Sequence, residues 1–321
     1  INTNDSGPGS LTAALTYANA NPGTRITFAI PTTDPGFDAE LGVWTLGPVL
    51  NNNWWHTRIT ADGTFLDGTT QTDAYGDLNP YGPEIQISGG TSTVSVAADD
   101  VVIRGFTLNG SAGSYATLTV LGGDNIVITG NYIGTDPTGT IAVPNTQGIR
   151  FDDISSRTIP HRVGGPDPAQ RNVISGNLGY GIWNGRWDSG KTNVIQGNYI
   201  GTNAAGTASI GNLQAGIFVE ATTTPLIGGT GPGEGNTIGY SDSVNVLVDP
   251  AATGVSILGN SITSSSGIGI DLGGDGVTAN DSGDVDTGAN DLLNFPVITA
   301  AVGAGGTVDL SFDLDVAAGN Y

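Results

Sequence analysis

The residues of this 321-residue chain best suited to chemistry are aspartates near its C-terminal end. Six of them fall within residues 271–291, interleaved with glycine, threonine and asparagine and with no lysine or arginine among them. Carboxylates this close repel one another, and Ca²⁺ prefers oxygen ligands on a flexible loop. The spacing therefore predicts a Ca²⁺ site, although it does not match an EF-hand loop and a solvated acidic loop is the alternative. The predicted ligands are Asp281, Asp284, Asp286 and Asp291.

A second concentration of reactive residue types lies between residues 150 and 191, which hold six of the nine basic residues. Asp152 and Asp153 are adjacent there and His161 follows them, and a pair of carboxylates can serve a glycosidase as acid and base. These three are the candidate catalytic residues of a polysaccharide-active enzyme. The alternative interpretation is an ion-paired loop without a catalytic role. Candidate ligand-binding residues on the same flank are Arg150, Trp183, Arg186 and Trp187.

Aromatic side chains gather a third time at Trp54 and Trp55, next to His56 and with Trp44 nearby. Neighbouring residues on a strand point to opposite faces, so one tryptophan of the pair is expected in the core and the other outside it. A packed end of the domain is favoured here over carbohydrate contact.

The composition argues against several classes of partner. The chain carries 30 acidic and 9 basic residues, a formal net charge of -21, which repels nucleic-acid phosphates and anionic lipids. No apolar run approaches the ~20 residues that span a bilayer, so no membrane insertion is predicted. Cysteine is absent, which excludes a disulfide framework and thiolate metal sites. An acidic, cysteine-free chain of this kind is predicted to be extracellular or displayed on a cell surface.

The elements that position these residues are sequence repeats. The run Gly-Asn-Tyr-Ile-Gly-Thr at residues 130–135 recurs at residues 197–202, and shorter Gly-Asn units recur at Gly176 and Gly259. Their spacings are close to multiples of about 20–25 residues, the length of one coil of a parallel β-helix. Glycine permits the sharp corner, and asparagine at the same corner of successive coils can bond to its neighbours above and below. The asparagines predicted to stack in this way are Asn131, Asn177, Asn198 and Asn260.

The two ends of the chain carry different signals. Residues 10–18 form the one good helical stretch, followed by a strand at 25–30, and this helix is expected to cover the first coil. Near the other end, residues 308–316 alternate apolar and polar without a fault, which predicts an amphipathic strand. No hairpin partner follows it, so we expect it to open a further domain or to be donated to another copy, giving self-association. Its apolar positions are Val308, Leu310, Phe312, Leu314 and Val316.

These motifs together resemble those of bacterial secreted and cell-surface right-handed parallel β-helix repeat proteins. The resemblance rests on residues 4–11 and 18–23 of the N-terminal cap, on the Ile-Gly-Thr and Ile-Gly-Gly units, and on the closing run that ends Asn-Phe-Pro. It implies an all-β fold, a right-handed parallel β-helix (a solenoid) with an N-terminal capping helix and a C-terminal amphipathic strand. The implied domain boundaries are 1–298 for the β-helix, with its cap at about 1–45, and 299–321 for the C-terminal strand.

The resemblance is less specific for function, because the same fold carries adhesins, structural modules and polysaccharide-active enzymes. Pectinase-type enzymes of this fold carry Gly-His-Gly and Arg-x-Lys signatures, and neither occurs in this chain. We therefore expect a non-catalytic extracellular or cell-surface structural or adhesive protein, which assembles into fibres if the C-terminal strand is donated. The alternative is a glycoside hydrolase, a lyase or a carbohydrate-binding protein that acts on polysaccharide through the 150–191 flank.

Overall fold

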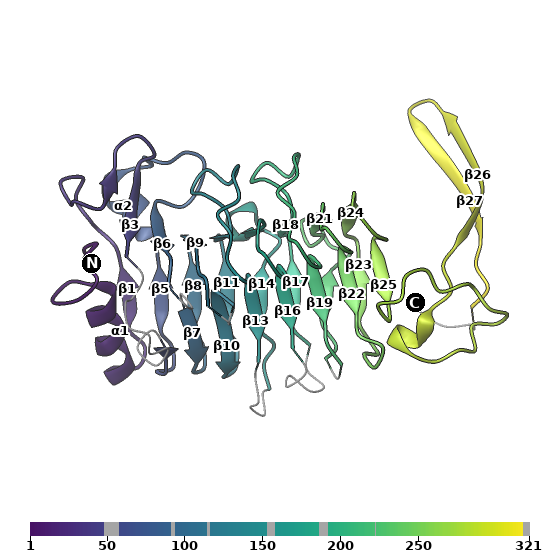
Figure 1. The fold of residues 1–321 in the computed structure, drawn as a ribbon, viewed down its shortest axis with the longest axis horizontal. Helices are drawn as coiled ribbons and strands as arrows, with labels where there is room; N and C mark the ends of the chain where they lie inside the picture. Colours follow the sequence, from purple (N-terminus) through teal and green to yellow (C-terminus); the bar gives the residue numbers. More distant parts are fainter. Residues whose placement is uncertain are drawn as a thin grey trace.

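Most of the regular secondary structure is β-strand, and all of the described strands except β26 and β27 lie in three long sheets that run along an elongated molecule (Figure 1). The computed structural model describes residues 1–47, 58–90, 94–113, 116–152, 158–185, 192–221 and 223–316. Within the three sheets, every described strand pair is parallel except one short pair near the N-terminus. The prediction of a mostly-β, solenoid-like chain with long parallel sheets is confirmed.

Successive strands of the chain fall into the three sheets in turn. The first sheet contains β1 (Arg25–Thr27), β5 (Phe65–Asp67), β8 (Val102–Arg104), β11 (Val127–Thr129), β14 (Arg162–Gly164), β17 (Val194–Gln196), β20 (Leu226–Gly228) and β23 (Ser256–Leu258). The second contains β4 (Arg58–Ile59), β7 (Val94–Ala97), β10 (Leu118–Gly122), β13 (Ile149–Phe151), β16 (Ile182–Asn184), β19 (Ile217–Val219), β22 (Val246–Val248) and β25 (Ile270–Leu272). The third contains β2 (Phe37–Asp38), β3 (Val43–Leu46), β6 (Ile85–Ser88), β9 (Phe106–Asn109), β12 (Tyr132–Ile133), β15 (Val173–Ile174), β18 (Tyr199–Ile200), β21 (Thr237–Gly239) and β24 (Ser261–Thr263). We call these sheets together the three-sheet body, and one pass of the chain through all three a coil.

Many coils are longer than the repeats in the sequence predict. Aligned residues of the first sheet give steps of 40, 37, 25, 35, 32, 32 and 30 residues, so in this sheet the predicted period of about 20–25 fits only the step from β8 to β11. In the other two sheets, five steps of 21–25 residues fit it. Two later coils carry an extra loop, at residues 135–142 and 202–209, and an antiparallel bridge closes each loop. The aligned residues of the first sheet are Arg25, Phe65, Val102, Val127, Arg162, Val194, Leu226 and Ser256.

The core is a stack of like residues at the centre of short strands. Ile103, Ile128 and Val163 pair in register and are fully buried, and Ile195 and Ile227 continue the same column. β-branched side chains suit this position because they pack well against identical neighbours on a pleated surface. Each such burial stabilises the fold by about 1.5–3 kcal/mol.

Buried asparagines form two ladders across the coils. Three of the predicted residues, Asn131, Asn198 and Asn260, lie in one ladder, which Asn172 and Asn236 complete through amide-to-amide bonds of 2.8–3.2 Å. The prediction that Asn177 shares this ladder is wrong. The Gly-Asn pair of Asn177 follows a strand of the third sheet, β15. The Gly-Asn pairs of Asn131, Asn198 and Asn260 each precede a strand of that sheet, so Asn177 lies at a different corner of the coil. The second ladder consists of Asn145, Asn177 and Asn212.

Helices are few in the described ranges. The predicted N-terminal helix is α1 (Leu11–Ala20), whose N-cap Ser10 accepts a hydrogen bond from the N–H of Ala13. Its buried face, which includes Leu15, packs on β1 and β4. Of the described helices, none has the length and apolar character needed to cross a membrane. The other helical segments are α2 (Thr70–Tyr75), η1 (Pro168–Gln170) and η2 (Ala289–Leu292).

The C-terminal strand is half of a hairpin. β26 (Val297–Ala304) pairs antiparallel with β27 (Thr307–Asp313), and the hairpin stands apart from the three-sheet body (yellow in Figure 1). The prediction of a strand without a hairpin partner is therefore wrong, since the partner precedes it. The strand also ends at Asp313, because Pro296 has no N–H with which to extend the ladder. Leu314 and Val316 consequently lie beyond β27.

Candidate functional site

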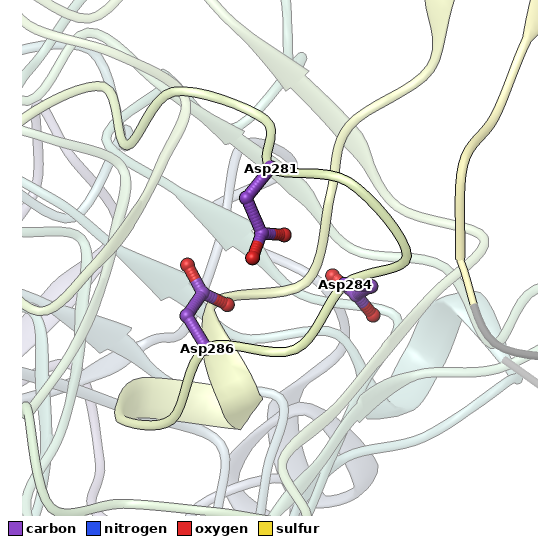
Figure 2. Close-up of side chains that lie close together, drawn as sticks. All are labelled: Asp281, Asp284 and Asp286. Atoms are coloured by element: carbon purple, nitrogen blue, oxygen red, sulfur yellow. The ribbon is translucent and has the colours of Figure 1, made fainter.

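The predicted Ca²⁺ loop lies between β25 and the hairpin. Asp281, Asp284 and Asp286 are partly buried, and one oxygen of each lies within 4.8 Å of the others. In Figure 2 the carboxylates of Asp281 and Asp286 point toward each other, with Asp284 beside them. The fourth predicted ligand, Asp291, is exposed and lies outside this group. The structure thus brings together three of the four aspartates.

A buried asparagine that the sequence reasoning missed holds this loop in place. The side chain of Asn294 accepts a bond from the N–H of Asp281 (2.9 Å) and donates to the carbonyl of the same residue (2.8 Å). It also donates to the carbonyl of Asp315 (2.6 Å), beyond the hairpin, while its backbone N–H bonds to the carboxylate of Asp284 (2.8 Å). Asp284 itself adopts the left-handed backbone conformation, with φ of 54°, which lets the loop turn tightly. Asn294 therefore fastens the acidic loop to both ends of the hairpin.

The electrostatics of the loop favour a cation. One oxygen each of Asp281 and Asp286 is shielded from solvent and has no hydrogen-bond partner in the described part of the chain. Desolvation, and after it the charges of Asp281 and Asp284, raise the pKa of Asp286. Residues 192–321 contain no lysine or arginine that could neutralise these carboxylates. A bound Ca²⁺ would relieve the repulsion and would take its remaining oxygens from backbone carbonyls and water.

Asp271, the first residue of the acidic run, has a different role. Its side chain is buried and accepts bonds from the N–H groups of Gly274 (3.0 Å) and Gly276 (3.3 Å). It closes the turn that follows β25 and does not join the three clustered aspartates.

On the 150–191 flank, the structure places Arg150 and Trp183 side by side on β13 and β16. The guanidinium carbon of Arg150 lies 4.0 Å from the centre of the Trp183 ring, and its Nε lies 2.7 Å from the carboxylate of Asp152. The indole N–H of Trp183 donates to Glu220 (2.8 Å), and its ring packs against Phe218. These side chains interact with one another. The predicted residues Asp153, Arg186 and Trp187 lie outside the described residues.

His161, the third candidate catalytic residue, is fully buried. Its ring stacks on Phe151 with centroids 5.5 Å apart, and its Nδ1 accepts a bond from the N–H of Ile126 (3.2 Å). The imidazole is thus part of the packing between coils. Trp44 is buried as well, with its indole N–H donating to the carbonyl of Pro31 (3.1 Å). Residues 54–56 lie outside the described ranges.

A groove of about 320 Å³ lies beside α2 and is lined by residues of the corners next to it and by Tyr132 and Val173 of β12 and β15. Its polar groups already have partners: Glu84 accepts from Thr72 (3.0 Å), and the hydroxyl of Tyr132 donates to the carbonyl of Tyr81 (2.6 Å). Arg171 stacks on a tyrosine ring at 4.2 Å. The groove therefore does not present a polar group aimed at a ligand.

Comparison of the chain with protein families, with curated proteins and with solved structures gave no match. In the described residues, the features that bear on function are the acidic loop, the paired residues of the basic flank and the exposed hairpin.

Proposed function

We propose that the protein is a non-catalytic structural or adhesive module, extracellular or at a cell surface, built as a right-handed parallel β-helix. Coils that enter three parallel sheets in turn support this architecture, as do the two asparagine ladders. Right-handed connections between parallel strands are the rule, which supports the handedness. Helix α1 serves as the N-terminal cap through its packing on β1 and β4.

The observation that carries the non-catalytic role is the mutual pairing of the candidate catalytic and binding groups. Arg150 is held by Asp152 and Trp183, and Trp183 by Glu220. His161 is buried in the packing between coils. A general acid or base must reach the proton that it transfers, and these side chains are directed at one another instead. Such pairing is expected of a flank that stabilises neighbouring coils.

The test is a turnover screen on acidic and neutral polysaccharides, with the Asp152→Asn variant as the probe. Asp242→Asn, at an exposed position on another coil, is the matched control. We expect the wild type and both variants to release no product above the buffer blank. Turnover that Asp152→Asn abolishes and Asp242→Asn keeps would contradict the proposal and favour the polysaccharide-active alternative.

We further propose that the acidic loop binds Ca²⁺ through Asp281, Asp284 and Asp286. The support is the convergence of the three carboxylates, the two shielded oxygens and the absence of basic residues from this part of the sequence. Because Asn294 links the loop to both ends of the hairpin, the ion would stiffen the joint between the three-sheet body and the hairpin. A Ca²⁺ ion that binds the folded chain and not the unfolded chain would raise the stability of the fold.

Thermal melting in Ca²⁺ and in EDTA tests this site. At about 100 times the dissociation constant the ion adds about 2.7 kcal/mol, so we expect melting to rise by several degrees. The rise is expected to vanish in Asp286→Asn and to persist in Asp291→Asn, whose exposed side chain lies outside the cluster. Identical melting curves with and without EDTA would remove the cation from the proposal.

The third element of the proposal is self-association through the hairpin. Val308, Leu310 and Phe312 are 64%, 56% and 55% exposed, and the predicted residues Leu314 and Val316 follow them. Soluble monomers rarely expose a continuous apolar patch, and such patches mark interaction surfaces. These residues therefore support a second copy of the chain as partner.

A further inference from the structure

The core of the three-sheet body is open at its C-terminal end. Within the described residues, β23, β24 and β25 are the last strands of their sheets. Ile270 pairs with Val246, which is fully buried, yet Ile270 itself is 38% exposed. The other inward-facing residues of this last coil are also partly exposed, and they are Ile257, Ile262 and Leu272. The residues with which they pair in the preceding coil are buried.

Cover at the two ends of the body is unequal. At the N-terminal end, α1 buries Leu11, Leu15 and Ala18 over the first coil. At the C-terminal end, η2 buries Ala289 and packs the partly buried Leu292 against the core, and the N–H of Asn290 bonds to the carbonyl of Ala252 (2.8 Å). A solenoid needs a cover over the apolar core at both ends. The exposed isoleucines at the C-terminal end therefore mark a surface that a partner can cover.

The strand register gives the hairpin one continuous apolar face. Paired residues share a face, and on one side these pairs join only apolar residues and glycine. They are Ile298 with Phe312, Ala301 with Leu310, and Gly303 with Val308. On the other side, Val302 pairs with Asp309, and Val297 with Asp313. A two-stranded hairpin is marginally stable alone, so the apolar face also needs a cover.

We propose that the apolar face of the hairpin packs on the open end of the three-sheet body of a second copy, and reciprocally. The result is a closed, tail-to-tail dimer. This inference rests on the proposed self-association and adds the surface that receives the hairpin. The hairpin does not cover its own end, because the loop of residues 273–296 separates it from β25 and Asn294 fastens its base (Figure 1).

The area supports a reciprocal arrangement. Eight residues at ~3.4 Å each, on two strands ~4.8 Å apart, give a hairpin face of about 260 Å². Two hairpins and the two surfaces that they cover would bury about 1,000 Å², which meets the lower limit of area for a biological interface. Two hairpins packed only on each other would bury about 500 Å², which does not. The N-terminal end is already covered, so the association stops at two copies.

Because the chain has no cysteine, engineered disulfides report directly on which surfaces meet. The Leu310→Cys variant is mixed with an isotopically heavy Ile270→Cys variant. The mixture is oxidised gently, and the disulfide-linked products are identified by their masses. We expect the mixed disulfide to exceed both homodisulfides by about tenfold, as proximity dictates. The matched control is Val302→Cys, on the opposite face of the hairpin and 59% exposed, which is expected to give no excess with Ile270→Cys.

Each contrary outcome has a distinct meaning. An excess of the Leu310→Cys homodisulfide would show that hairpins meet each other, overturning this inference while leaving self-association intact. A disulfide within one chain carrying both substitutions would show that the hairpin covers its own end, and this too overturns it. Yields equal to the Val302→Cys control, for chains that sediment as monomers, would overturn self-association together with the inference.

Discussion

Removing one amide from the middle of the longer asparagine ladder is expected to cost far more than its size indicates. Asn198 is fully buried. Its Nδ2 donates to the carbonyl of Val163 (2.9 Å) and to Asn236 (3.0 Å), and its Oδ1 accepts from the backbone N–H (3.3 Å) and the Nδ2 (2.9 Å) of Asn172. In Asn198→Ala the buried N–H of Asn172 loses its acceptor. A buried N–H group without an acceptor destabilises the fold by about 1–3 kcal/mol, and each further hydrogen bond lost destabilises it by about 1 kcal/mol. The free energy of unfolding of Asn198→Ala is therefore expected to fall by about 3–5 kcal/mol.

Asn260→Ala is the matched control, at the end of the same ladder. Asn260 is only partly buried, and it bonds to the carbonyl of Ile227 (2.8 Å) and to Asn236 (2.8 and 3.0 Å). Water can reach these groups after the substitution and replace the lost amide. We therefore expect Asn260→Ala to cost about 1 kcal/mol.

The assay is urea unfolding followed by far-ultraviolet circular dichroism, with the slopes compared to check that both variants unfold the same surface. Because repeat proteins can unfold in parts, amide exchange of β15, β18 and β21 provides a local measure. We expect the two variants to differ by at least about 2 kcal/mol. Equal losses, or a loss below about 1 kcal/mol in Asn198→Ala, would refute the view that the buried ladder holds the coils in register.

Two further predictions concern acid stability and backbone crowding. Burial opposes the charge of Asp67, but bonds from Arg104 and other donors outweigh it and lower its pKa to about 2. Because the folded pKa lies below the unfolded value, this carboxylate stabilises the fold above about pH 4 and loses its contribution, about 1–2 kcal/mol, as the pH falls toward 2. Urea midpoints measured from pH 6 to pH 2 should fall less in Asp67→Asn, and parallel curves would contradict this. In Gly201→Ala the new methyl group would stand 1.9 Å from the carbonyl oxygen of Gly239, whereas Gly76, also at positive φ, has open space. Gly201→Ala should therefore lower the melting temperature much more than Gly76→Ala. Equal shifts would show that neighbouring coils can move apart to admit the methyl group without loss of stability.

Much of the fold was predictable because the repeat keeps like residues at like places. The Gly-Asn units at residues 130 and 197 predicted the corner, and the alternation of residues 308–316 predicted the strand that is observed as β27. The period was underestimated, because loops such as 135–142 lengthen some coils without changing the strands that stack. Asn177 shows the same limit: its local sequence resembles that of Asn198, and only the position of the strand relative to the pair separates the two corners.

The candidate site was harder to predict than the fold. The cluster of Asp281, Asp284 and Asp286 follows from sequence proximity, but Asp291 is exposed and its carboxylate lies outside the cluster. Asn294 was missed because its role depends on segments that meet only in three dimensions. The hairpin partner was missed because residues 297–304 contain alanine and glycine at positions where a strand signal needs larger apolar side chains.

Sedimentation velocity of the 321-residue chain over a wide range of concentration tests self-association, the central proposal, most directly. The expected result is that a dimer of 64.8 kDa, twice the 32.4 kDa of one chain, is the one assembled species and increases at the expense of monomer as the concentration rises. Phe312→Ser, on the apolar face, should shift the equilibrium to monomer, and Val302→Ser, on the opposite face, should leave it unchanged. A species of 32.4 kDa at every concentration would contradict the proposal.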